Sequence, residues 1–85
     1  MKKLNIDKAP QKELERIDAA TRRRVVGGIM GLILDPPQGD IKALSGKDGF
    51  RLRVGDYRIL FKADNESIRI HEIGLRGQIY KGAKR

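Results

Sequence analysis

The segment Phe50–Phe61, with the sequence FRLRVGDYRILF, determines how the second half of the chain folds. Apolar and basic residues alternate on both sides of Gly55–Asp56, which is typical of two half-buried strands. A two-residue loop with glycine first suits a type II′ turn, so we predict a β-hairpin. Its register pairs Val54 with Tyr57, Leu52 with Ile59 and Phe50 with Phe61. These apolar residues then face the core, and Arg51, Arg53 and Arg58 lie on the opposite surface.

Two helices are predicted before the hairpin, because apolar residues recur there at steps of three and four. Asp7 is the expected N-cap of the first helix, whose first turn tolerates Pro10. Asp18 is the expected start of the second helix, and Asp35–Pro37 should stop it. Three glycines disfavour the second helix, by about 1 kcal/mol each relative to alanine, unless they permit a close approach to another element.

A third strand is predicted at Ser67–His71, after a turn at Ala63–Glu66. Its isoleucines should face the core, which adds Arg69 and His71 to the basic face. Glu72–Gly74 breaks the alternation, so we expect a bulge or a strand end there that re-aims Leu75 and Arg76. A short strand at residues 3–6 could complete the sheet.

Composition and charge limit the class of protein. The chain has 85 residues, which suits one domain over residues 1–85. The net charge is +8, and +6 of it lies in residues 41–85, so a polyanion such as nucleic acid is the expected partner. With no cysteine and one histidine, we expect no disulfide and no metal. The longest apolar run, Val25–Leu34, is half of the ~20 residues that a membrane span needs, and residues 1–7 suggest no signal peptide, so a cytoplasmic location is expected.

Three motifs together resemble the RelE/ParE superfamily of bacterial and archaeal toxins. They are Leu44–Gly46, the Phe50–Phe61 hairpin, and the segment Gly74–Tyr80 with the sequence GLRGQIY. The resemblance covers nearly the whole chain. It implies an α+β fold, in which a small twisted antiparallel sheet carries an N-terminal helical hairpin on one face, and this agrees with the faces deduced above. It also implies no cofactor and a co-expressed antitoxin, expected to be acidic and helical.

The resemblance also implies a function and a set of site residues. RelE-like members are ribosome-dependent endoribonucleases that cut mRNA in the ribosomal A site. By this resemblance, Arg58 and Arg76 of this chain would clamp the scissile phosphate, and Tyr80 would stack on or orient the target nucleotide. Arg51 and Arg53 match basic strand residues of that surface. Arginine is always protonated, so we assign both to phosphate binding, together with Arg69 and His71 of the basic face.

Other interpretations remain open. RelE relatives have lysines where this chain has Arg51 and Arg53, and many have His or Lys in place of Leu75. ParE-like members of the same fold poison DNA gyrase instead of cutting RNA. A third interpretation is that the chain is a non-enzymatic, RNA-binding relic of the fold. His71 has a purely structural interpretation as well, as an exposed or hydrogen-bonded residue of a strand.

Overall fold

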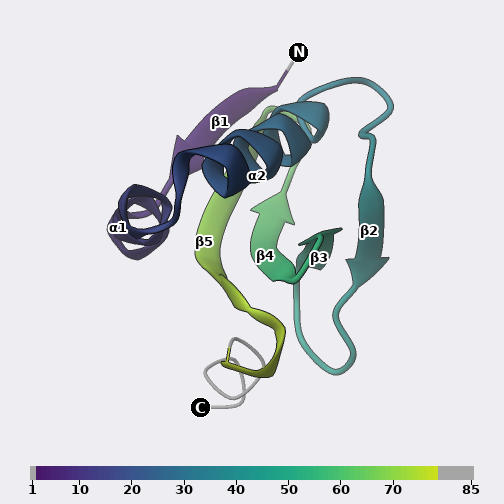
Figure 1. The fold of residues 1–85 in the computed structure, drawn as a ribbon. Coiled ribbons are helices and arrows are strands. Elements are labelled where there is room, and N and C mark those ends of the chain that lie inside the picture. Colours follow the sequence, from purple (N-terminus) through teal and green to yellow (C-terminus); the bar gives the residue numbers. More distant parts are fainter. Residues whose placement is uncertain (1, 79–85) are drawn as a thin grey trace.

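The structure is a computed structural model that describes residues 2–78. A five-stranded sheet in the order β1-β5-β4-β3-β2 carries both helices on one side (Figure 1). The strands are β1 (Lys3–Ile6), β2 (Asp40–Ala43), β3 (Phe50–Val54), β4 (Tyr57–Ala63) and β5 (Ser67–Leu75), and the helices are α1 (Lys8–Arg16) and α2 (Ala19–Gly31). The predicted α+β fold with an N-terminal helical hairpin is therefore confirmed.

The β3–β4 hairpin has the predicted register throughout. Val54 pairs with Tyr57, Leu52 with Ile59 and Phe50 with Phe61. Gly55 has a φ of +57°, and none of the described non-glycine residues has a positive φ. A type I′ turn needs positive φ at both central residues, whereas a type II′ turn needs it only at the first. The turn is therefore of the II′ kind, as the Gly-Asp order predicts.

The edges of the sheet differ from the prediction. β1 exists at the predicted residues, but it pairs in parallel with β5, so the sheet is mixed and not wholly antiparallel. Strand β2, which was not predicted, pairs antiparallel with β3 at the other edge. It is short and largely exposed, so it carries little hydrophobic alternation. Its pairing with β3 nevertheless brings Asp40 opposite Arg53.

The helices begin where the sequence indicates. Asp18 caps α2, since its carboxylate accepts a hydrogen bond from the Thr21 N–H at 3.0 Å. Asp7 occupies the N-cap position of α1 but makes no side-chain capping bond, because its carboxylate binds Arg69. α2 ends at Gly31, before the predicted stop at Asp35–Pro37, and Gly31 lies directly against the backbone of Gln38.

One arginine locks the two helices together. The Arg22 side chain donates hydrogen bonds to the carbonyl oxygens of Leu14 at 2.7 Å, Ile17 at 2.9 Å and Glu15 at 3.2 Å. These carbonyls belong to the last turn of α1 and the residue after it, where helical carbonyls lack internal partners. The cationic guanidinium also complements the negative end of the helix dipole. Arg22 is therefore a structural arginine.

The core lies between the helices and the inner face of the sheet. Val25 and Ile29 of α2 are fully buried against the hairpin, where Gly28 leaves room for Val54. The rest of the buried apolar cluster consists of Ile17, Leu32, Ile33, Leu52, Ile59, Phe61, Ile68, Ile70 and Ile73. Phe50 and Phe61 stack in register with ring centroids 5.5 Å apart. Within residues 2–78, no helix is long and apolar enough to cross a membrane.

Strand β5 contains a bulge, close to where the alternation fails. Leu60 of β4 pairs with Glu72, and the next residue, Phe61, pairs with Ile70, so His71 is the extra residue. The bulge allows Ile70 and Ile73, three residues apart, both to enter the core. The strand then continues to Leu75. A bulge at this place was expected, but the alternative of a strand end at Glu72–Gly74 is wrong.

Candidate nucleic-acid interface

Three arginines, called here the hairpin arginines, lie on the sheet face opposite the helices. They are Arg51, Arg53 and Arg58, and Arg53 is paired directly with Arg58 across the hairpin. Their neighbours Leu52 and Ile59 are buried in the core on the other face. Because side chains alternate along a strand, the predicted placement of the three arginines is correct.

Asp40 holds two of these arginines together. Its carboxylate accepts Arg53 Nε at 2.6 Å and Arg51 Nη2 at 3.3 Å. The Arg51 side chain is only 15% exposed and that of Arg53 is 53% exposed. The carboxylate therefore fixes two positive side chains side by side, and it neutralises part of their charge. The sequence analysis missed Asp40, because the β2–β3 pairing was not predicted.

Arg58 is far more buried than a surface phosphate ligand was expected to be. It is 5% exposed, and its Nη1 donates hydrogen bonds to the carbonyl oxygens of Gly55 at 3.0 Å and Tyr57 at 3.1 Å. Both carbonyls belong to the turn of its own hairpin. Arg58 therefore braces the turn, and its buried Nε has no hydrogen-bond partner among residues 2–78. The alternation of the sequence gives the face of a residue but not its depth.

The end of β5 places Arg76 beside the turn of the β3–β4 hairpin. Gly74 pairs with Arg58 in the β4–β5 register, and the Arg76 N–H donates to the Asp56 carbonyl at 3.1 Å. The side chain of Arg76 is exposed. The structure thus brings Arg76 to the same end of the sheet as Arg53 and Arg58. Tyr80, the remaining residue expected at the site, lies outside the described residues.

Arg69 and His71 lie elsewhere, near the opposite end of β4. With Lys62 they line a cavity of about 250 Å³, called here the bulge pocket. Arg69 is held by Asp7, whose carboxylate accepts Arg69 Nε at 2.9 Å and Arg69 Nη2 at 3.0 Å. This ion pair lowers the pKa of Asp7 and raises that of Arg69. The single basic face expected from the sequence is therefore divided into two clusters.

His71 is half-buried at the bulge. Burial lowers its pKa from the ordinary value of 6.5, because desolvation disfavours the charged imidazolium. Glu72 and Asp7 oppose this shift, while Lys62 and Arg69 add to it. Its Nε2 is buried and finds no hydrogen-bond partner in the part of the chain that the structure describes. His71 is therefore expected to be neutral at pH 7, and it is not near the hairpin arginines in the strand register.

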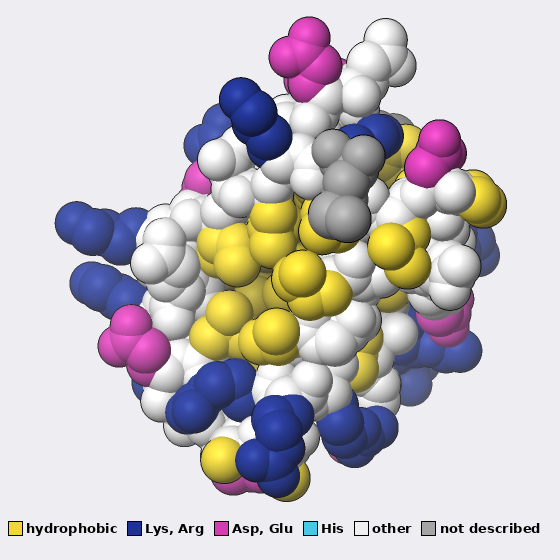
Figure 2. Space-filling model, turned by 90° about the horizontal axis from the view of Figure 1, so that it is seen from above, with side chains coloured by type: hydrophobic (Ala, Val, Ile, Leu, Met, Phe, Trp, Pro, Cys, Tyr) yellow, Lys and Arg dark blue, Asp and Glu magenta, His cyan; other side chains and the backbone are white. Residues whose placement is uncertain are grey.

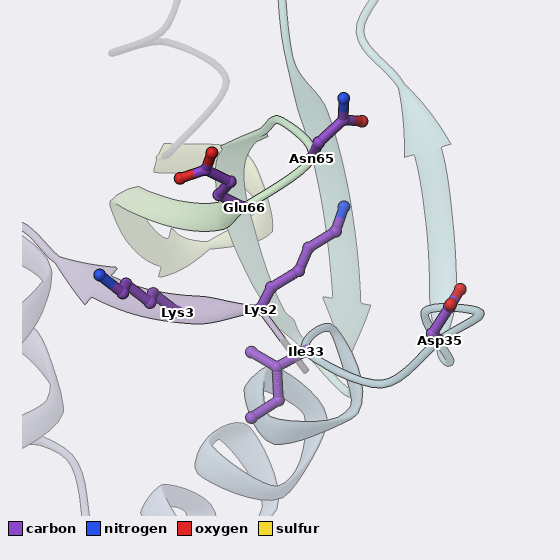
Figure 3. Close-up of a pocket in the computed structure, with 6 residues that line it drawn as sticks. All are labelled: Lys2, Lys3, Ile33, Asp35, Asn65 and Glu66. Atoms are coloured by element: carbon purple, nitrogen blue, oxygen red, sulfur yellow. The ribbon is translucent and has the colours of Figure 1, made fainter.

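Another cavity, between the start of β1, the segment after α2 and the β4–β5 turn, has mixed charge. It measures about 570 Å³ and is lined by Lys2, Lys3, Ile33, Asp35, Asn65 and Glu66 (Figure 3). Two lysines and two carboxylates balance there, so the lining favours neither an anion nor a cation. Over residues 2–78, there is no group of three metal-binding side chains of the His, Cys, Asp or Glu types.

The helical side of the molecule exposes apolar side chains. Val26, Met30 and Leu34 are 39%, 46% and 42% exposed and follow one another at intervals of four residues. This spacing places them along one side of α2 and its continuation. In the view from above, apolar side chains gather in the centre of the surface, and both basic and acidic side chains surround them (Figure 2).

The comparison with known families identifies the class. The model of the ParE toxin of type II toxin–antitoxin systems, parDE, matches residues 4–80. The chain therefore belongs to this toxin family, within the RelE/ParE superfamily. No curated protein sequence matches the chain significantly.

Solved structures support the fold. The RelB–RelE antitoxin–toxin complex from Methanococcus jannaschii contains a chain that is 24% identical, with a TM-score of 0.74 over 92% of this chain and 96% of that one. The RelBE2 complex from Mycobacterium tuberculosis gives 20% identity and a TM-score of 0.74, over 88% and 98% of the two chains. The isolated Escherichia coli RelE toxin gives 18% and 0.72, over 99% and 96%. At these identities the likeness concerns the fold.

Proposed function

We propose that this type II toxin is an endoribonuclease of the RelE kind that cuts mRNA in the ribosomal A site. The observation that carries the proposal is the convergence of arginines at one end of the sheet. Arg53 and Arg58 are cross-strand partners, and the bond from the Arg76 N–H to the Asp56 carbonyl anchors Arg76 beside their turn. Such a cluster suits a phosphate group, because guanidinium groups bind phosphate oxygens bidentately.

Cleavage of RNA by attack of a 2′-OH suits a site built from arginines, whose side chains are always charged. A ribose 2′-OH loses its proton and attacks the neighbouring phosphate, the new P–O2′ bond forms, and the bond to the 5′-oxygen breaks as that oxygen takes up a proton. The phosphorane between these steps carries additional negative charge, and arginines placed beforehand stabilise it without changing protonation. In this proposal Arg76 contacts the scissile phosphate from the exposed rim. Arg53 and Arg51 bind phosphates of the mRNA, and Tyr80 orients the nucleotide at the cleavage site.

The burial of Arg58 gives it a specific part in this site. Its Nη1 is engaged by Gly55 and Tyr57. Arg58 therefore holds the turn to which Arg76 is anchored, and it adds positive charge beneath the phosphate. We assign it a positioning role as well as an electrostatic one. This differs from the expectation that Arg58 is a freely exposed clamp.

The experiment that tests the proposed function is ribosome-dependent cleavage of a defined mRNA by the purified chain. Arg76→Ala should remove most of the activity while the fold is kept, because the side chain is exposed. Arg16→Ala is the matched control, since Arg16 is a 78% exposed arginine on α1 that pairs only with Glu13 among the described residues. Equal loss in both variants would point to general charge and not to the site.

The second candidate function is inhibition of DNA gyrase, and the family match favours it, since the matching model is that of the ParE toxin. The same preparation should therefore be assayed for gyrase supercoiling. Cleavage of mRNA with normal supercoiling supports the first proposal. Inhibited supercoiling with intact mRNA supports the second.

The proposed partner is an acidic, helical antitoxin. A net charge of +8 favours a negatively charged partner, and Val26, Met30 and Leu34 offer apolar surface for an amphipathic helix. These residues lie on the helical side, whereas the hairpin arginines lie on the other face of the sheet. An antitoxin that covers both must pass around an edge of the sheet.

A further inference from the structure

The two basic clusters are separated along strand β4. Arg58, Leu60 and Lys62 alternate on the same strand, so their side chains belong to one face. Leu60 is 1% exposed and lies between the two charged residues. Lys62 follows Arg58 by four residues, which span about 13 Å along a strand. This distance is several times the ~3.4 Å rise of a stacked nucleotide. A phosphate at one cluster therefore cannot be the phosphate at the other.

The bulge pocket has the features of a built anion site. Lys62 and Arg69 are paired in the β4–β5 register, and both line the pocket with His71. Asp7 accepts Arg69 Nε and Nη2 and so fixes the orientation of the guanidinium. A guanidinium has five N–H donors, so most of them are not used by Asp7. The described residues accept no other bond from Arg69.

The bulge itself creates this arrangement. Because His71 is the extra residue of β5, it remains on the pocket side although Ile70 and Ile73 both enter the core. Bulges commonly re-aim side chains next to functional sites. The half-buried imidazole forms part of the wall, and its buried Nε2 would have to turn outward to reach a ligand. Lys62 and Arg69 are therefore the groups that contact the ligand.

We propose that the bulge pocket is a second phosphate subsite, which binds a phosphodiester of single-stranded RNA a few nucleotides away from the hairpin arginines. Lys62 supplies a point charge, Arg69 supplies oriented donors, and Asp7 is a positioning residue. Asp7 and Glu72 reduce the net charge of the pocket, so free inorganic phosphate is bound weakly. The RNA stays in the bulge pocket because the hairpin arginines bind other phosphates of the same RNA molecule. This inference deepens the proposed function and rests on it.

The single histidine of the chain provides a direct reporter for this subsite. The full chain is titrated with a short single-stranded oligoribonucleotide while the His71 imidazole resonances are followed by NMR. We expect a saturable shift with RNA and a much weaker response to inorganic phosphate. His71 resonances that stay unchanged while the oligonucleotide binds would overturn the proposal.

A pair of variants tests the contact itself. Lys62→Gln should weaken oligonucleotide binding about threefold to fivefold and lower the slope of log K against log salt by about 0.7, as expected for one phosphate of a single strand. Lys12→Gln, an exposed lysine on α1, is the matched control and should change neither the affinity nor the slope beyond the general effect of one charge. Equal effects of both substitutions would contradict a specific subsite.

The binding measurements test the subsite independently of whether the protein cleaves mRNA. If the His71 signals shift and Lys62→Gln lowers the slope, but no mRNA is cut, the subsite stands and the proposed enzymatic function fails. If mRNA is cut and Lys62→Gln behaves as Lys12→Gln, the function stands and the subsite is wrong. A single-stranded DNA of the same sequence measures how much of the binding requires ribose 2′-hydroxyls.

Discussion

The backbone N–H of Arg76 donates a hydrogen bond to the carbonyl oxygen of Asp56 at 3.1 Å. Asp56 is the second residue of the β3–β4 turn, and Arg76 is the first residue after β5. This one contact connects a segment at the end of the described chain with the turn that Arg58 supports. It explains how Arg76, which is distant in sequence, shares one end of the sheet with the cross-strand partners Arg53 and Arg58.

Arg76→Ala is expected to lower the rate of ribosome-dependent mRNA cleavage by about a hundredfold, because one donor to developing negative charge is lost. Its melting temperature should stay near that of the wild type, since the bond to Asp56 is made by the backbone. Cleavage rates and thermal melts of the purified variant measure both. A variant that is folded and as active as the wild type would exclude Arg76 from the site.

Arg58→Ala is expected to destabilise the fold, in contrast to Arg76→Ala. It removes a side chain that is only 5% exposed, together with the bonds that Nη1 donates to the part-buried carbonyls of Gly55 and Tyr57. Leaving such groups unsatisfied costs about 1–3 kcal/mol, which lowers the melting temperature of a domain this small by several degrees per kcal/mol. Urea unfolding gives the free energy. An unchanged midpoint would show that Arg58 does not brace the turn.

Asp40→Asn is expected to tighten RNA binding several-fold, because two arginines lose the carboxylate that neutralises them. Stability should change little, since Asp40 and Arg53 are about half exposed and the contact of Asp40 with the less exposed Arg51 is long, at 3.3 Å. Fluorescence anisotropy with a labelled oligoribonucleotide checks the affinity, and Asp48→Asn, an exposed carboxylate of the β2–β3 loop, controls for net charge. Identical gains in both variants would show that pairing with Arg51 and Arg53 is irrelevant to binding.

The ion pair of Asp7 and Arg69 should stabilise the fold only when Asp7 is ionised. Its pKa in the folded chain is lowered from 3.8, chiefly by the hydrogen bond from Arg69, so around that pH the unfolded chain binds more protons than the folded one. Stability therefore rises with pH through this window. The advantage of the wild type over Asp7→Asn should be present at neutral pH and disappear as the pH falls below the folded pKa. Thermal melts from neutral to strongly acidic pH test this, and a difference that does not change with pH would contradict it.

His71 should titrate below 6.5, because burial disfavours its charged form. An NMR titration of the single imidazole gives the midpoint directly. Since the unfolded chain binds this proton more readily, the contribution of His71 favours folding above 6.5 and weakens as the pH falls below it. A midpoint above 6.5 in the free protein would show that Asp7 and Glu72 outweigh burial.

The sequence predicted local features well. The Gly55–Asp56 turn determines the register of the hairpin, and each predicted pair is present because alternation and turn geometry act over a few residues. Asp7 and Asp18 mark the helix starts for the same reason. A bulge or a strand end was expected near the true position of the bulge, because the alternation of apolar and polar residues fails there.

Partners that are distant in sequence could not be predicted. Asp7 and Arg69 are 62 positions apart, and Asp40 reaches Arg53 only through strand β2, which has little hydrophobic pattern. The burial of Arg58 also escaped prediction, because alternation does not report depth. These non-local contacts divide the expected basic face into the hairpin arginines and the bulge pocket.

The measurement that tests the central claim most directly is cleavage of a defined mRNA on purified ribosomes by the wild-type chain, Arg76→Ala and Arg16→Ala, with gyrase supercoiling assayed in parallel. The account predicts new mRNA 5′-ends with the wild type and Arg16→Ala, very few with Arg76→Ala, and unchanged supercoiling. Intact mRNA together with inhibited supercoiling by the wild-type chain would contradict it.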